Sequence, residues 1–179
     1  MKFKKITGIC KARKEMVIFE EEGREQWLGD GVGSYPLFGM PYFTEVGLQR
    51  TCDLTDTQWD KIMFRKKIFP EGYNFGDYDE TESRCGTGDI TVSYRGIEVT
   101  PVHTEEGIMF IDGKYLEPFS DMRERELYLR ETPGGVKYFA VKLGMMIYGI
   151  IMPLIEMPSE FTKKLGRVYE SLKVAEENE

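Results

Sequence analysis

Residues 127–152 read LYLRETPGGVKYFAVKLGMMIYGIIM and contain three apolar segments. The first two segments, Leu127 to Leu129 and Val136 to Leu143, flank Pro133-Gly134-Gly135, which predicts a tight turn between two strands. The third segment, Met145 to Met152, is apolar on both faces, which predicts a central strand. Strands joined by tight turns favour an antiparallel sheet with helices packed on it.

The segments upstream extend this pattern. Residues 90–94 alternate in polarity, and Arg95-Gly96 predicts a turn into a second strand over residues 97–102. Asp112-Gly113 is a strong two-residue hairpin signal between the apolar residues 108–111 and residues 114–116. The second half of the chain is therefore predicted to be rich in β-structure.

The first half mixes helices and a hairpin. Phe3, Ile6, Ile9 or Cys10, and Arg13 follow a 3.6-residue period, which predicts a helix. Residues 16–19 and 25–28 predict a hairpin across Glu22-Gly23. In the glycine-rich residues 29–41, Pro36 and Pro41 exclude a central strand or a regular helix.

Two helices are expected next, around Glu45 to Cys52 and from Thr55 onward. Thr55 and Gln58 fit a capping box, and Trp59 with Ile62 or Met63 would lie on one face behind it. Residues 70–89 are rich in glycine and acidic residues, which predicts a long loop.

A final amphipathic helix is expected to begin at Ser159 as its N-cap. Its predicted buried stripe consists of Phe161, Leu165, Val168, Tyr169 and Leu172. The acidic residues 175–179 are expected to fray, and no internal repeat is visible. The whole pattern predicts one α+β domain over residues 1–179, a mostly antiparallel sheet with N-terminal, short middle and C-terminal helices packed on it.

Composition and charge limit the function classes. The 179 residues have a net charge of −7 and 41% hydrophobic residues, which fits one globular domain. No apolar run approaches the roughly 20 residues of a membrane span. The first residues also lack the continuous apolar core of a signal peptide, so a cytoplasmic location is expected.

Catalytic and metal motifs are scarce. The three cysteines and the single His103 are scattered, which argues against a disulfide framework and a zinc site. Cys85 is the best nucleophile candidate, because the neighbouring Arg84 would lower its pKa, but no base is identifiable. The sequence therefore predicts a protein that is not an enzyme, with no catalytic residues, metal or cofactor.

Aromatic residues beside glycines and cations predict a ligand site. Aromatic rings stack on bases, and Arg, Lys and hydroxyl groups bind phosphates. In the alternative interpretation, Leu37, Phe38 and Phe43 are core residues and the cations form a solvated face. The candidate ligand-binding residues are Tyr35, Phe38, Tyr42, Arg65, Lys66, Tyr73, Phe75, Arg84 and Thr87.

Two stretches resemble known groups of proteins. Residues 27–31 (WLGDG) and 35–41 (YPLFGMP) resemble a pattern in proteins of phages and prophages of Gram-positive bacteria. This resemblance implies a phage-encoded accessory protein in the bacterial host and carries no functional residues. Residues 138–142 (YFAVK) and 148–154 (YGIIMPL) are similar to the closing strands of bacterial DNA sliding-clamp domains, which implies fold more than function.

Four functions follow as hypotheses. The first is a non-enzymatic phage protein, a homo-oligomeric sponge that sequesters a cyclic nucleotide or a cyclic ADP-ribose-type immune signal. The second is a clamp-like accessory of DNA replication, although the net charge disfavours a DNA partner. Its DNA-lining cations would be Lys2, Lys4, Lys5, Lys11, Arg13 and Lys14. The third is an inhibitor that binds a host protein through its acidic surface, and the fourth is a small hydrolase using His103 or carboxylates.

Overall fold

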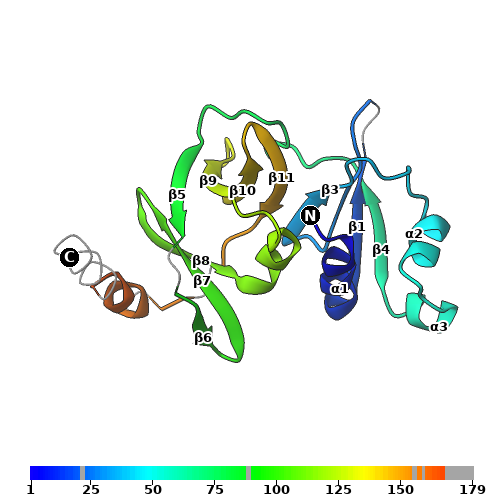
Figure 1. The fold of residues 1–179 in the computed structure, drawn as a ribbon, viewed down its shortest axis with the longest axis horizontal. Helices are drawn as coiled ribbons and strands as arrows, with labels where there is room; N and C mark the ends of the chain where they lie inside the picture. The colour runs from blue at the N-terminus through cyan, green and yellow to red at the C-terminus, as the bar shows by residue number, and fades with distance from the viewer. Residues whose placement is uncertain (21–22, 88–89, 155–156, 159, 168–179) are drawn as a thin grey trace.

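One large β-sheet runs through the chain (Figure 1). The computed structural model describes residues 1–179 except 21–22, 88–89, 155–156, 159 and 168–179. The elements are α1 (Phe3–Arg13), β1 (Glu15–Phe19), β2 (Trp27–Gly29), β3 (Gly33–Pro36), α2 (Glu45–Thr51), α3 (Asp56–Trp59), β4 (Met63–Lys67), β5 (Ser83–Thr87), β6 (Val92–Tyr94), β7 (Ile97–Thr104), β8 (Gly107–Asp112), the 3₁₀-helix η1 (Gly113–Phe119), β9 (Glu126–Glu131), β10 (Lys137–Leu143) and β11 (Met146–Ile151).

The strand order confirms the predicted α+β class. Among the described residues the sheet has 11 strands in the order β4-β1-β2-β3-β11-β10-β9-β5-β7-β6, with β8 paired to β7. All of these pairings are antiparallel except that of β1 with β4. The apolar strand β11 lies between β10 and β3, as its sequence predicts.

The prediction that the prolines exclude a central strand is wrong for Pro36. Strand β3 lies between β2 and β11, and Pro36 is its last residue. The next residue, Leu37, donates its N–H to Gln26 on the β2 side, so the missing N–H of Pro36 faces the β11 side. There the pairing already ends at Ser34, and the proline therefore breaks no hydrogen bond of the sheet.

The hairpin predicted at Asp112-Gly113 is also wrong. Asp112 instead caps η1, because its carboxylate accepts the backbone N–H of Lys114 at 3.2 Å. The hairpin turn lies earlier, between Thr104 at the end of β7 and Gly107 at the start of β8. An Asp-Gly pair is compatible with the first residues of a helix and with a tight turn. The pair alone therefore does not distinguish a helix start from a hairpin.

Two strands differ from the predicted elements. The capping box at Thr55 is present, but α3 ends at Trp59, and Met63 begins β4 instead of continuing a helix. The predicted loop over residues 70–89 contains β5. Both strands are short and largely polar, so they lack the apolar alternation by which strands are identified.

The C-terminal helix is described over residues 160–167. Phe161 packs against the rings of Tyr94 and Phe110 at centroid distances of 6.1 and 6.0 Å, so this helix lies against β6 and β8. Ser159, three residues of the predicted stripe (Val168, Tyr169 and Leu172) and the tail 175–179 lie outside the described residues.

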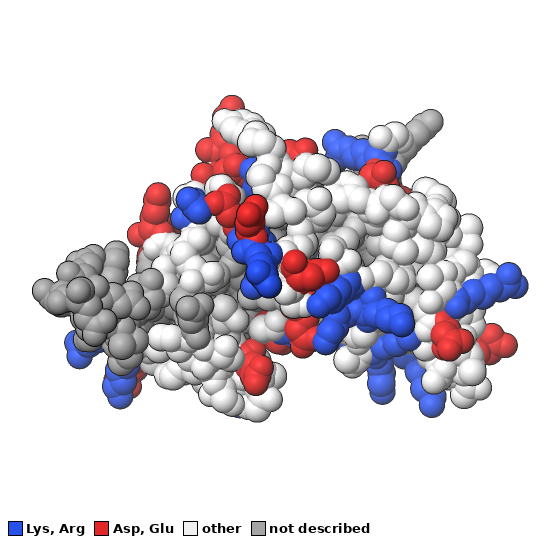
Figure 2. Space-filling model, in the orientation of Figure 1, with Lys and Arg blue, Asp and Glu red and all other residues white. Residues whose placement is uncertain are grey.

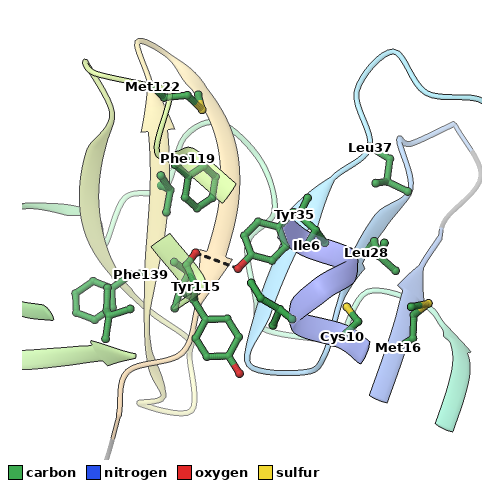
Figure 3. Packing of buried hydrophobic residues seen from close by; sticks show 14 of the residues in the cluster. Ile6, Cys10, Met16, Leu28, Tyr35, Leu37, Tyr115, Phe119, Met122 and Phe139 are labelled. Carbon is green, nitrogen blue, oxygen red and sulfur yellow. Dashed lines mark hydrogen bonds between the residues drawn. The ribbon is translucent and has the colours of Figure 1, made fainter. Parts of the chain in front are cut away.

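The main core lies between the sheet, α1 and η1 (Figure 3). Ile6 and Cys10 of α1 point toward the sheet, and they belong to the same buried cluster as Leu28 and Tyr35. The Tyr35 hydroxyl donates to the carbonyl of Tyr115 in η1 at 3.0 Å, drawn as a dashed line. This buried hydrogen bond joins the two halves of the sheet through η1.

The architecture contains an approximate structural repeat. Helix α1 precedes the meander β1-β2-β3, and η1 precedes the meander β9-β10-β11. The last strands of the two meanders, β3 and β11, pair antiparallel, and α1 contacts η1. A Pro-Leu pair lies near the end of each unit: Pro36 is the last residue of β3 and precedes Leu37, and Pro153-Leu154 comes shortly after β11. No repeat is visible in the sequence because only the patterning is shared.

Within the ranges that the structure describes, no helix is both long and apolar enough to cross a membrane.

Candidate functional site

Several pockets of the described surface meet at Arg24, in the turn between β1 and β2. One has a volume of about 300 Å³ and is lined by Arg24 with the rings of Trp27, Phe38, Phe69 and Phe75. We call it the aromatic groove. A second, of about 750 Å³, is lined by Arg24 with Glu20, Tyr42, Lys66, Lys67 and Ile68, and we call it the lysine pocket.

Ring packing shapes the aromatic groove. The Phe75 ring lies edge-on to Trp27 at a centroid distance of 4.9 Å and to Phe69 at 4.5 Å. The Arg24 guanidinium carbon lies 5.8 Å from the centroid of the Phe69 ring, within cation–π range. The groove therefore has aromatic walls and a cation at the end that it shares with the lysine pocket.

Hydrogen bonds order the lysine pocket around Glu20. The Lys66 ammonium lies 2.7 Å from a Glu20 carboxylate oxygen, and the Tyr42 hydroxyl donates to the other oxygen. The hydrogen bond from Lys66, followed by that from Tyr42, lowers the pKa of Glu20. The Lys67 ammonium has no partner among the described residues, so it adds a second lysine cation to the pocket beside the ordered ion pair.

Five of the nine candidate residues meet around Arg24: Phe38, Tyr42, Lys66, Tyr73 and Phe75. The other four lie elsewhere. Tyr35 is only 1% exposed in the core, which excludes direct contact with a ligand. Arg65 pairs with Glu15 at 3.6 Å on β4, outside these pockets.

Arg84 and Thr87 line a separate open cavity of about 720 Å³. Arg123, Arg125, Thr91 and Thr100 also contribute to its lining, and we call it the arginine basin. Of the nine candidates, the structure therefore places five at Arg24 and two in the basin.

A buried ion network holds the wall of the aromatic groove. Arg130 in β9 is fully buried and donates to the carbonyls of Asn74 and Gly76 at 3.0 and 2.9 Å. It also pairs with Glu82 at 2.7 Å, and Glu82 accepts from Lys142 at 2.8 Å. The segment containing Tyr73 and Phe75 is thereby fixed to the sheet.

The nucleophile hypothesis for Cys85 loses its physical basis in the structure. Arg84 turns to Glu126, with a nitrogen–oxygen distance of 2.5 Å. Burial raises the pKa of Cys85, which keeps the thiol protonated and weakly nucleophilic. No cluster of three or more metal-ligating side chains occurs among the residues that the structure describes.

Sequence reasoning missed three residues that shape the grooves, Arg24, Trp27 and Phe69. Arg24 and Trp27 belong to the predicted hairpin, which was interpreted only as a fold element. Phe69 follows Arg65-Lys66-Lys67 after one residue, so it belongs to the same aromatic and cationic pattern and the sequence carries a signal for it.

Comparison with known proteins identifies no relative. No protein family matches the chain, and comparisons with curated proteins and with solved structures give no match. The resemblances to phage proteins and to sliding clamps therefore stay predictions.

Proposed function

We propose that this chain is a non-enzymatic binding protein for a small anionic ligand with an aromatic ring, of the nucleotide class. The observation that carries the proposal is the convergence of the aromatic groove and the lysine pocket at Arg24. The biological role that we propose is a phage-encoded sponge for a cyclic nucleotide or a cyclic ADP-ribose-type signal, acting as a homo-oligomer in the host cytoplasm.

The two pockets suit the two ends of a nucleotide. A base is flat and apolar on its faces, and the ring-lined groove of about 300 Å³ offers stacking partners. Phosphates need cations, and Lys67 beside Lys66 supplies them at the other side of Arg24. Such an arrangement requires no reacting group, which fits a protein that holds its ligand unchanged.

Thermal unfolding against cyclic dinucleotides, cyclic trinucleotides and cyclic ADP-ribose isomers tests the proposal. A ligand at 100 times its Kd stabilises the folded state by about 2.7 kcal/mol, which raises Tm measurably. The Phe38→Ala and Lys67→Ala variants are expected to weaken the ligand's Kd about tenfold each, because each removes one contact.

Matched controls distinguish binding in the groove from general effects. Tyr78 is 67% exposed and Lys61 is exposed, and both lie outside these two pockets, so Tyr78→Ala and Lys61→Ala should leave Kd unchanged. No stabilisation by any nucleotide, or equal losses in the controls, contradicts the proposal. Recovery of a chemically altered ligand after heating contradicts its non-enzymatic part.

A second candidate function, DNA binding by a clamp-like accessory, is favoured by α1. Residues 1–14 contain six Lys and Arg residues and no Asp or Glu, in a chain of net charge −7. Figure 2 shows basic side chains gathered over α1. Lys4 in the first turn of α1 opposes the helix dipole, and its ammonium group has no partner among the described residues, so its presence favours a role outside folding. The repeated units with adjacent helices also suit the clamp-like resemblance.

Charge reversal on α1 tests DNA binding. Lys4 and Lys14 are exposed, and their ammonium groups have no partner among the described residues. If α1 contacts DNA, Lys4→Glu and Lys14→Glu should each weaken duplex binding and reduce the slope of log K against log salt by about 0.9. Fluorescence anisotropy measures both, with Lys61→Glu as the control. Absence of salt-dependent binding in the native protein eliminates this function.

A further inference from the structure

The arginine basin is a second site whose chemistry differs from that of the aromatic groove. It opens between β5, β7 and the start of β9, with Leu116 and Leu127 as apolar parts of its lining. Its volume of about 720 Å³ lies within the usual range of about 300–1,000 Å³ for small-molecule sites. The two sites share no lining residue.

The basin carries an excess of guanidinium groups. Arg84 pairs with Glu126, the single carboxylate among the described lining residues. Arg125 donates through Nη1 to the carbonyls of Phe119 and Met122 at 3.3 and 3.2 Å. Arg123 is exposed and has no partner among the described residues. Among the described lining residues, three guanidinium groups therefore face one carboxylate.

Hydroxyl groups complete the polar lining. No described residue forms a hydrogen bond with the hydroxyls of Thr87, Thr91 or Thr100, so they are available as donors. Guanidinium groups bind phosphate oxygens through paired N–H groups, and hydroxyls add single hydrogen bonds. None of the described lining residues is aromatic, so the basin offers no platform for a base.

We propose that the arginine basin binds a compact, multiply charged phosphate compound, either a polyphosphate or a sugar phosphate. Arg123 and Arg125 contact the phosphate oxygens, and Arg84 joins them when the ligand displaces Glu126. This exchange is easy because the Arg84 side chain is 71% exposed, so solvent already weakens its ion pair. Glu126 therefore acts as a competitor for the anion.

Isothermal titration calorimetry with inorganic pyrophosphate tests the site. The native chain should bind pyrophosphate, and Arg123→Ala should weaken the Kd about tenfold or more, because a charged hydrogen-bond donor is lost. Glu126→Gln should tighten the Kd several-fold, since it frees Arg84 while keeping a side chain that accepts from Tyr128. If Glu126 had only a structural role, the Glu126→Gln substitution would not tighten pyrophosphate binding.

Controls separate this site from the proposed function. Arg50→Ala removes an exposed arginine on α2 and should leave pyrophosphate affinity unchanged. Phe38→Ala and Lys67→Ala should also leave it unchanged, so the two sites succeed or fail independently. Titration with glucose 6-phosphate distinguishes a sugar phosphate from a polyphosphate by which probe binds tighter. Absence of binding by both probes, or equal affinity of native protein and Arg123→Ala, overturns the proposal.

Discussion

Replacing Arg130 by methionine is expected to lower the free energy of unfolding by about 3–5 kcal/mol, because one partner of a buried ion network is removed. Arg130 is fully buried. Without it, Glu82 keeps Lys142 as its one charged partner among the described residues, and the carbonyls of Asn74 and Gly76 lose the donor that Arg130 supplies. Chemical denaturation measures the change, and Tm should fall by about 6–20 °C.

The matched control is Arg84→Met. Arg84 also lies on a strand and pairs with a glutamate, but its side chain is 71% exposed. Solvent screening limits such a pair to about 1 kcal/mol or less. Limited proteolysis adds a local measurement, because loss of Arg130 should expose residues 74–82 to cleavage before the sheet unfolds. Equal stability losses in the two variants contradict this account of the network.

The sequence predicted the elements that carry their own periodic signal. The spacing of Phe3, Ile6 and Cys10 predicted helix α1, and an apolar run predicted strand β11. These predictions succeed because an element that buries one face or both faces has apolar residues at regular positions in its sequence. Strands β4 and β5 carry no such pattern. Each is defined by a neighbour distant in sequence, β1 for the first and β9 for the second, and local reasoning has no access to that neighbour.

The candidate site divides along the same line. The pattern of aromatic and cationic residues correctly predicted positions that meet around Arg24. It also predicted Tyr35, which is buried in the core. Local composition states which groups are present, whereas tertiary packing decides which of them face solvent together. The role of Arg130 was invisible for this reason, since the carbonyls that bind it lie more than fifty residues away.

The second large effect is expected at Gly29. A Cβ atom added there would lie 1.9 Å from the carbonyl oxygen of Gly33 and 2.9 Å from the Cα of Ser34. Both contacts are with backbone, and β2 and β3 pair at this point through Gly29 and Ser34, so the clash cannot be relieved by a side-chain rotation. Gly29→Ala should therefore cost at least about 4 kcal/mol, in the range of the most damaging substitutions.

Gly8→Ala is the matched control because it adds the same methyl group with the opposite expected sign. Gly8 is exposed within α1, and nothing lies within 4 Å of the added Cβ. Alanine in a helix interior is favoured over glycine by about 1 kcal/mol, so Tm should rise by about 2–4 °C. Denaturation of both variants decides the matter. A Gly29→Ala protein as stable as the native chain would mean that β2 and β3 do not approach this closely at Gly29. The Asp30 carboxylate accepts hydrogen bonds from the Gly33 N–H and the Tyr115 hydroxyl, and these bonds would then need revision, because they depend on the same turn.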